Sequence, residues 1–242
     1  MSRRIDHNIV DWHRYAATYD MLLTYNPFYK QLQQEVLAIV RQWTFDPGEQ
    51  VADVGAGTGN YSIELASLFP QVKVLHIDNN EGMNSVMQRK KEKRTLENIQ
   101  TMAVPIDDLK LPEGTLSACL CMHSLYTFPN PQAILKKIYA WMKPGARGVF
   151  VDPGRPVNVF QWQIAIGWHM IKHYGLGKTL KIMREGREVS RQNRQISKLQ
   201  AQGVYWKHDH AQFCDAVRAA GFAIMESRLC FRKMSDMVVV RK

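Results

Sequence analysis

The chain has 242 residues, of which 45% are hydrophobic and 22% charged. This length fits one domain of ordinary size, and this composition excludes an intrinsically disordered protein. Residues 1–11 lack the apolar core of a secretory signal. The most apolar stretch, residues 157–171, is interrupted by polar side chains and is shorter than the roughly 18 residues of a membrane span. We therefore expect a cytoplasmic protein that does not cross a membrane.

The formal net charge is +10. Such a charge favours an acidic partner, which can be nucleic acid, an anionic membrane surface or an anionic small substrate, and charge alone does not choose among them. The four cysteines include no C-x-x-C pair, so neither a disulfide framework nor a zinc site is expected. Cys119 and Cys121 are two residues apart in an apolar run, which predicts core positions on one face of a strand.

Helices and strands are expected to alternate along most of the chain. Residues 11–43 have helical periodicity, and 45–48 form a turn. From residue 50 onward, short apolar runs typical of buried parallel strands alternate with helical segments. The expected strands are 50–54, 72–77, 99–104, 115–122 and 148–151, the expected helices are 60–69, 81–94 and 131–142, and a Lys143-Pro144-Gly145 turn precedes the fifth strand.

This alternation predicts a Rossmann-like α/β fold with a seven-stranded, mainly parallel sheet. The last two strand-like runs, 222–231 and 237–240, are too close for a helical crossover, so we expect an antiparallel C-terminal hairpin. We interpret the chain as a single domain. It consists of an N-terminal helical cap (1–46), a ligand-binding core (47–154), a helical insertion or lid (155–202), and a C-terminal helix with the hairpin (203–242).

A glycine-rich turn follows the first strand. Its glycines stand at 55, 57 and 59, whereas a dinucleotide fingerprint requires G-x-G-x-x-G. Asp53, at the end of the strand, would repel a pyrophosphate but would pair with a cationic ligand. The turn therefore favours a ligand that has an amino group and no phosphates.

Two further acidic positions follow neighbouring strands. Asp78 closes the second strand about 20 residues after the glycines, where a carboxylate can hold the hydroxyls of a ribose. Asp107 and Asp108 follow the third strand, where a purine edge would lie. Ligands of open α/β sheets bind at this edge, so these residues are expected to converge.

With these motifs, the chain resembles the class I S-adenosylmethionine-dependent methyltransferases of the small-molecule type. The resemblance implies that S-adenosylmethionine is the cofactor and that an antiparallel hairpin ends the sheet. It implies that Tyr15 to Asp20 belong to a segment that closes over the cofactor. Where many relatives have Gly-Asp before the adenine loop, this chain has Val104-Pro105. The resemblance assigns the methionine part to Asp53, Gly55, Gly57 and Gly59, the ribose to Asp78, the adenine to Ile106 and Asp107, and further cofactor contacts to Tyr19, Asn79 and Met122.

The acceptor side is less defined. The Asn/Asp-Pro-Pro-aromatic motif of relatives that methylate exocyclic amines is absent, which makes nucleic acid an unlikely acceptor. His123 follows the fourth strand and is a candidate general base or positioning residue. Asp152, Tyr126, Tyr15 and Trp168 are candidate acceptor contacts. No metal-ligand pattern occurs, so no metal is expected.

The insertion combines an apolar, aromatic segment (160–171) with a basic one (178–198). This pattern describes either a lid over a hydrophobic acceptor site or a helix that lies on an anionic membrane surface. We expect methyl transfer to O, N or C of a small or lipophilic acceptor, such as a natural product, a quinone-like ring or a lipid headgroup. The alternatives are a non-catalytic S-adenosylmethionine-binding protein and a nucleic-acid methyltransferase that uses the basic insertion.

Overall fold

A computed structural model describes residues 10–156 and 158–242. The absence of a leader was inferred mostly from residues outside this range, and the apolar stretch 157–171 begins outside it. In the described residues, every helix is too short or too polar to cross a membrane.

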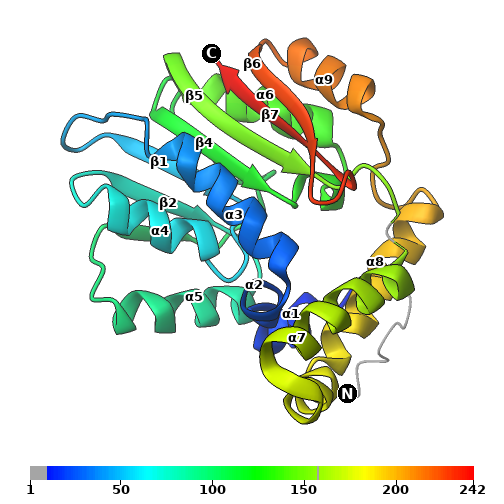
Figure 1. The fold of residues 1–242 in the computed structure, drawn as a ribbon. Helices are drawn as coiled ribbons and strands as arrows, with labels where there is room; N and C mark the ends of the chain where they lie inside the picture. Colours follow the sequence, from blue (N-terminus) through cyan, green and yellow to red (C-terminus); the bar gives the residue numbers. More distant parts are fainter. Residues whose placement is uncertain (1–9, 157) are drawn as a thin grey trace, which may run out of the picture.

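The core is one seven-stranded sheet with the order β3-β2-β1-β4-β5-β7-β6 (Figure 1). The first five strands are parallel to one another, and β7 is antiparallel to both β5 and β6. The expected Rossmann-like fold with an antiparallel hairpin is therefore confirmed. The strands are β1 Gln50–Val54, β2 Lys73–Ile77, β3 Ile99–Met102, β4 Leu116–Met122, β5 Met142–Asp152, β6 Ala223–Cys230 and β7 Ser235–Arg241.

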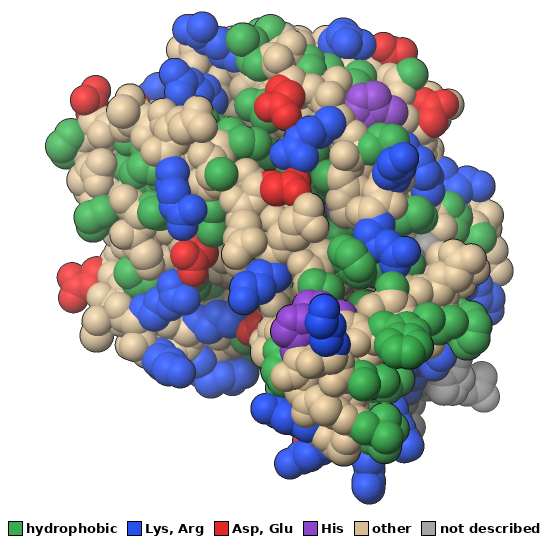
Figure 2. Space-filling view, in the orientation of Figure 1, with side chains coloured by type: hydrophobic (Ala, Val, Ile, Leu, Met, Phe, Trp, Pro, Cys, Tyr) green, Lys and Arg blue, Asp and Glu red, His purple; other side chains and the backbone are tan. Residues whose placement is uncertain are grey.

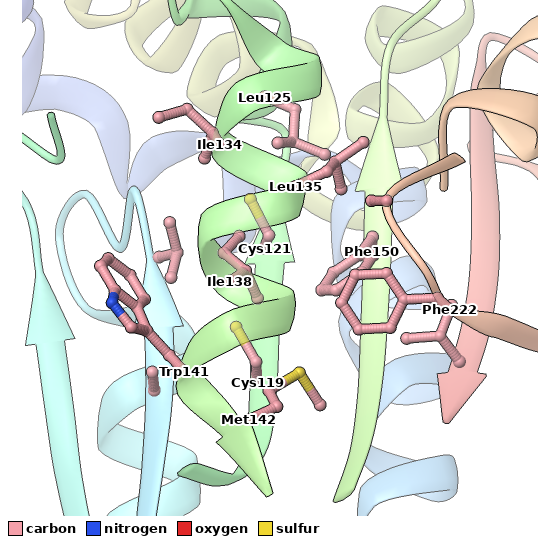
Figure 3. Close-up of a cluster of buried hydrophobic side chains, with 14 of the residues drawn as sticks. Cys119, Cys121, Leu125, Ile134, Leu135, Ile138, Trp141, Met142, Phe150 and Phe222 are labelled. Atoms are coloured by element: carbon pink, nitrogen blue, oxygen red, sulfur yellow. The ribbon is translucent and has the colours of Figure 1, made fainter. Parts of the chain in front are cut away.

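Helices cover both faces of the sheet because alternate strand residues point to opposite sides. In β1, Val51 belongs to the cluster under α3 (Pro27–Val40), α4 (Asn60–Leu68) and α5 (Glu81–Lys93). Ala52 and Val54 belong to the opposite cluster, under α6 (Pro131–Trp141) and α9 (His210–Ala219). Figure 3 shows this second cluster, in which Cys119 and Cys121 lie beside α6. All four cysteines are free and buried, as the apolar run predicted for the strand pair.

One predicted element needs correction. Residues 143–145 were expected to form a turn before a strand that starts at Gly148, but β5 already starts at Met142. Leu116 of β4 pairs with Met142 while Ala118 pairs with Arg147, so the segment between them leaves the ladder as a bulge. A Pro-Gly pair can form such a bulge inside a strand because it interrupts the ladder only locally.

Four helices form a lobe beyond the ends of β4 and β5, and its first helix packs on α5 (Figure 1). They are α1 (Trp12–Tyr19), α2 (Met21–Tyr25), α7 (Val159–Glu185) and α8 (Arg187–Ala201), and α7 is kinked at Gly175. The segment predicted as an insertion is therefore helical.

The first and last helices of this lobe are joined by polar contacts. Arg14 of α1 lies 3.4 Å from Glu188 of α8, and the Tyr15 hydroxyl donates to Asn193 at 3.2 Å. The N-terminal cap and the insertion thus pack together although about 180 residues separate them in the sequence. We call α1, α2, α7 and α8 the helical lobe.

Candidate cofactor and acceptor site

A cavity of about 410 Å³ lies at the carboxyl ends of β1, β2 and β4, beneath α1, α2 and α3. Its volume is in the range of small-molecule sites. Polar residues line its sheet side, and aromatic and apolar residues of the helices line the other. Of the residues predicted to contact cofactor or acceptor, it brings together Tyr19, Asp53, Gly55, Gly57, Asp78, Asn79, Ile106, Asp107, Met122 and His123.

The glycine-rich turn is packed closely on the strand beside it. A Cβ atom on Gly55 would lie 2.3 Å from the Cβ of Ser124, so only glycine allows β1 and the end of β4 to approach this closely. A Cβ atom on Gly57 would instead meet open space apart from one methionine sulfur at 4.0 Å. Gly57 thus leaves room for a ligand against the backbone.

Asp53 is a buried carboxyl group without a cationic partner in the described residues. It is 2% exposed, and its Oδ2 accepts a hydrogen bond from the Ser62 hydroxyl at 2.7 Å. Burial raises the pKa of Asp53 to about 7 despite that hydrogen bond. A ligand with a positive charge would offset this burial, whereas a phosphate would be repelled.

Asp78 connects the second strand to the glycine-rich turn. Its Oδ2 accepts the Gly57 N–H at 2.8 Å, and its Oδ1 accepts the Asn80 N–H at 2.8 Å. Burial raises its pKa in spite of both bonds. Each carboxylate oxygen has two lone pairs, so the group retains the capacity to accept two hydroxyl donors.

The loop after β3 borders the cavity with Val104, Pro105, Ile106 and Asp107. Lys137 of α6 holds this loop in place, because its ammonium group donates to the carbonyl oxygens of Ile106 and Asp107, both at 2.7 Å. No sequence pattern indicated this lysine, since it lies about 30 residues further along the chain and on another element.

Some predicted residues lie outside the cavity. Gly59 is absent from its lining, and a Cβ atom there would lie 2.3 Å from the Met87 side chain, so this glycine serves the packing of α4 on α5. Tyr15 is buried beneath the ring of Tyr19. Trp168 is 71% exposed on α7, away from the cavity.

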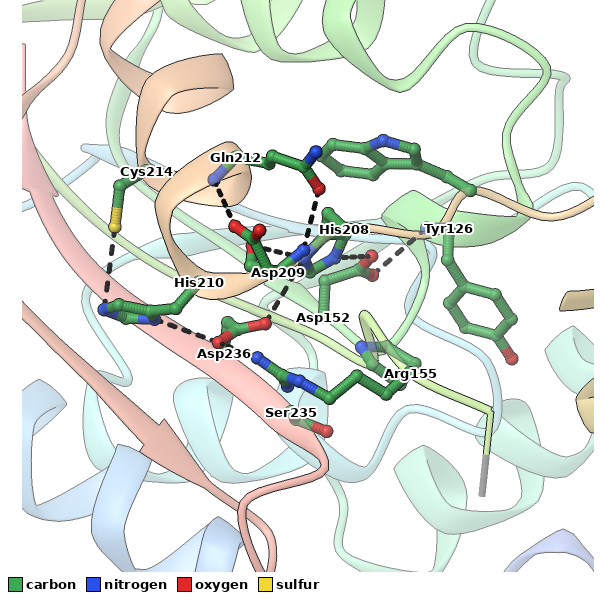
Figure 4. Close-up of polar contacts among 12 residues, drawn as sticks. Tyr126, Asp152, Arg155, His208, Asp209, His210, Gln212, Cys214, Ser235 and Asp236 are labelled. Atoms are coloured by element: carbon green, nitrogen blue, oxygen red, sulfur yellow. Dashed lines mark hydrogen bonds and ion pairs between the residues drawn. The ribbon is translucent and has the colours of Figure 1, made fainter. Parts of the chain in front are cut away.

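Tyr126 and Asp152 also lie outside the cavity, in a buried polar network (Figure 4). Asp152 accepts the Tyr126 N–H at 3.1 Å, and its other oxygen lies 3.1 Å from Nε2 of His208. Nδ1 of His208 lies 3.3 Å from Asp236, which also pairs with Arg155. Burial alone would lower the pKa of His208, but the two carboxylates raise it to about 9. The network therefore ties the chain after α8 to the ends of β5 and β7.

His123 lies in the cavity wall with a left-handed backbone, φ 52°. Its Nε2 is 2.9 Å from the Ser235 hydroxyl and its Nδ1 is 3.4 Å from the Tyr29 hydroxyl. Burial lowers the pKa of His123 to about 4. The imidazole is consequently uncharged at neutral pH and is held by partners on two distant elements.

The sequence analysis did not predict several residues that line or support the cavity. Tyr29, Leu32 and Gln33 come from α3, whose helical pattern indicated only core packing. Asp20 was named only as part of a motif, yet it accepts the Thr58 hydroxyl at 2.6 Å and pairs with Lys90 at 2.6 Å. These contacts fasten the N-terminal cap to the glycine-rich turn.

Known proteins resemble this chain in the same regions. Residues 51–145 match the family model of a methyltransferase domain. A demethylmenaquinone methyltransferase of Symbiobacterium thermophilum is 28% identical over 123 residues, which are 50% of this chain and 49% of the relative. The chain thus matches about half the length of this curated relative.

Solved structures share the fold at low sequence identity. An S-adenosylmethionine-dependent methyltransferase of Aquifex aeolicus has a TM-score of 0.61 at 14% identity, over 95% of this chain and 97% of the other. Phosphoethanolamine N-methyltransferase 2 of Haemonchus contortus, in complex with S-adenosylmethionine, has a TM-score of 0.64 at 12% identity, over 97% of this chain and 60% of the other.

The domain match, the strand order and the buried carboxyl group of Asp53 in the cavity indicate the same class of protein. Residues 51–145 match a methyltransferase domain, and the chain has the fold of solved S-adenosylmethionine-dependent methyltransferases, as its motifs indicated. The cofactor of this class is S-adenosylmethionine.

Proposed function

We propose that the protein transfers the methyl group of S-adenosylmethionine to a small, lipophilic acceptor. The observation that carries this proposal is the two-sided lining of the cavity. Carboxylates line the sheet side, while Trp12, Leu23, Tyr29 and Phe128 line the side of the helices and the loop after β4. A polar, cationic cofactor and an apolar acceptor can therefore occupy adjacent parts of one site.

The residues of the sheet edge fit the cofactor. Asp53 would pair with its ammonium group, since this buried carboxyl has no other cationic partner in the described part of the chain. Asp78 would accept the ribose hydroxyls, and Ile106 and Asp107 would border the adenine. S-adenosylmethionine, when bound, supplies an electrophilic methyl group on a positively charged sulfur.

The chain's own residues would orient the acceptor and exclude water. The nucleophilic atom of the acceptor would gain the methyl group as the carbon–sulfur bond breaks, S-adenosylhomocysteine would leave, and any proton on that atom would pass to solvent. Alignment in a desolvated site accelerates such a step. Uncharged His123 would accept a hydrogen bond from the acceptor or position Tyr29, because its pKa of about 4 makes it a weak base.

A quinone-like ring is the acceptor that the comparisons support best. The curated relatives include demethylmenaquinone methyltransferases, although the match covers only half of each chain. An aromatic wall formed by Trp12, Tyr29 and Phe128 suits the flat face of such a ring. A non-planar natural product or a lipid headgroup would make less contact with this aromatic wall.

The test is incubation of the protein and methyl-labelled S-adenosylmethionine with extract of the source cells. We expect label in the organic fraction, and no label there with the Asp78→Ala variant. Label in RNA would favour a nucleic-acid methyltransferase that uses the basic insertion, and RNA affinity should then fall steeply with salt. Cofactor binding without transfer to any fraction would favour a non-catalytic binding protein.

We further propose that the outer face of α7 contacts an anionic membrane surface. Phe160, Ile164, Trp168 and Ile171 recur at helical spacing and are between 39% and 71% exposed. Leu176 and Leu180, which follow the kink, are also exposed, at 61% and 59%. Figure 2 shows Lys and Arg side chains around this lower end of the molecule. Exposed aromatic residues with basic neighbours are typical of interfacial helices.

Sedimentation with vesicles tests this contact. We expect binding to vesicles that contain phosphatidylglycerol, weaker binding at higher salt, and loss of binding in Trp168→Ser. Met225→Ser is the matched control, since Met225 is 65% exposed on β6. Equal sedimentation of both variants would contradict the proposal.

A further inference from the structure

The helical lobe encloses a second cavity, which the proposed function does not use. It measures about 530 Å³ and lies between α2, α7 and α8. Its α7 side is formed by Gln163, Ile166, Gly167 and Met170, which are spaced at helical intervals on a different face from the exposed apolar stripe. The cavity is therefore distinct from the outer face of α7.

The inner part of this cavity is apolar. Leu22 of α2, with Met170 and Ile182 of α7, lines it, and each of these side chains is at most 7% exposed. A hydrocarbon chain that packs against these three side chains would remove apolar surface from water.

The rim of the cavity is cationic. Arg187, Arg191 and Arg194 line it from α8, at spacings that place them on one face of that helix. The acid among them is Glu188, which is engaged by Arg14 at 3.4 Å, by Arg191 at 3.9 Å and by the Gln192 amide at 2.7 Å. Within the described residues, neither Arg187 nor Arg194 has a carboxylate partner. A guanidinium group that has no carboxylate partner favours binding of a phosphate or carboxylate ligand.

We propose that this cavity binds an amphiphile with one anionic head group and a single hydrocarbon chain. The arginine rim holds the phosphate or carboxylate, and the chain lies against Leu22, Met170 and Ile182. The ligand is either a free anionic amphiphile or a lipid taken from a membrane, since both present the same chemistry. The proposal is independent of methyl transfer, and cofactor affinity serves as the control for folding.

The cavity can be filled without disturbing the helix. Gly167 lines it, and a Cβ atom there would meet nothing within 4 Å. Gly167→Met therefore places a side chain in the cavity and replaces a glycine that is unfavourable inside a helix. Gly177→Met is the matched control, because Gly177 is also on α7, also meets nothing within 4 Å and lies outside the cavity.

The experiment is a calorimetric titration of the full chain with dodecyl phosphate below its micellar concentration. We expect binding that is at least about tenfold tighter than that of dodecanol, lost in Gly167→Met and retained in Gly177→Met. Replacing Arg187 and Arg194 together by Gln should remove the preference for phosphate and leave dodecanol unchanged.

Vesicles that contain phosphatidic acid distinguish the two sources. Binding to monomeric amphiphile and to vesicles, both lost in Gly167→Met, supports the cavity as a lipid site, and binding to the monomer alone supports a free ligand. Equal affinity for dodecyl phosphate and dodecanol, or unchanged affinity in Gly167→Met, would overturn the proposal.

Discussion

The sheet edge and the helical lobe present different kinds of residue. At the sheet edge, Asp53 is buried and accepts from Ser62 at 2.7 Å, while half-buried Asp78 accepts from Gly57 and Asn80, both at 2.8 Å. In the helical lobe, large apolar side chains such as Phe160 and Trp168 are about 70% exposed, and the arginines of α8 lie at the surface.

This difference indicates a division of roles. The sheet edge is fixed by short, local connections between strand and helix, so it suits an invariant cofactor. The lobe is joined to the rest of the molecule mainly through α1, which packs on α5, and through contacts such as Asp20 with Lys90. It therefore suits the recognition of an acceptor, a surface or an amphiphile.

The largest effect is expected from removing a carboxylate of the sheet edge. Asp78→Ala should weaken S-adenosylmethionine binding by at least about 30-fold, because two hydrogen bonds to a charged group are lost. The measurement is a calorimetric titration. Glu113→Ala, at an exposed position, is the control and should bind normally. Unchanged affinity in Asp78→Ala would remove the sheet edge as the cofactor site.

The network that anchors the chain after α8 should make stability depend on pH. The folded-state pKa of His208, about 9, exceeds the ordinary histidine pKa of 6.5. Its contribution, on the order of 3 kcal/mol, is therefore complete below about pH 6.5 and is lost as pH rises through 9. The measurement is the free energy of unfolding in denaturant, compared between the wild type and His208→Gln. The difference should shrink from pH 6 to pH 9.5, and a constant difference would argue against a charged His208.

Cofactor affinity should also depend on pH at the sheet edge. The pKa of Asp53 is about 7, so its carboxylate form is the minor species at pH 6 and the major one at pH 8. We expect the affinity for S-adenosylhomocysteine to increase about tenfold over this range, because only the charged form pairs with an ammonium group. Asp53→Asn should bind more weakly and flatten the profile. A flat wild-type profile would contradict the proposed pairing.

The contacts of Asp20 at the end of α1 with Lys90 and Thr58 should affect cofactor affinity less than Asp78 does. Asp20→Asn removes the charge that pairs with Lys90 and accepts from Thr58. Because the Asp20 side chain is 35% exposed, we expect cofactor affinity to fall only about fivefold. Asp215→Asn on α9, where the carboxylate is 75% exposed, is the control. A loss as large as that of Asp78→Ala would mean that the cap is part of the cofactor site.

The smallest effect is expected at His123. If it positions rather than removes a proton, His123→Gln should retain turnover within about threefold, and the pH profile between 6 and 9 should be unchanged. The readout is label in the organic fraction. A large loss that varies with pH would instead assign His123 as a general base.

The sequence predicted the sheet edge well because its information is local. Asp53 and the three glycines lie within seven residues, and Asp78 follows the next strand, so strand and helix periodicity was sufficient to bring them together. Even there, Gly59 was assigned to the ligand although it packs against Met87, since a G-x-G-x-G pattern does not distinguish packing from binding.

The acceptor side was harder to predict because its contacts join distant segments. Tyr29 meets His123 across 94 residues, and Tyr15 meets Asn193 across 178. Tyr126, Asp152 and Trp168 were selected for their residue type near strand ends or in an apolar helix. Only the packing of β5, β7 and α7 reveals that Asp152 faces His208 and that Trp168 faces solvent.

The most direct test of the cofactor assignment is a calorimetric titration of the full chain with S-adenosylmethionine and, separately, with NAD. We expect one equivalent of S-adenosylmethionine to bind, and NAD to produce no saturable heat, because Asp53 and the G-x-G-x-G turn repel a pyrophosphate. Saturable binding of NAD with no binding of S-adenosylmethionine would contradict the assignment of the site and the methyl transfer proposed from it.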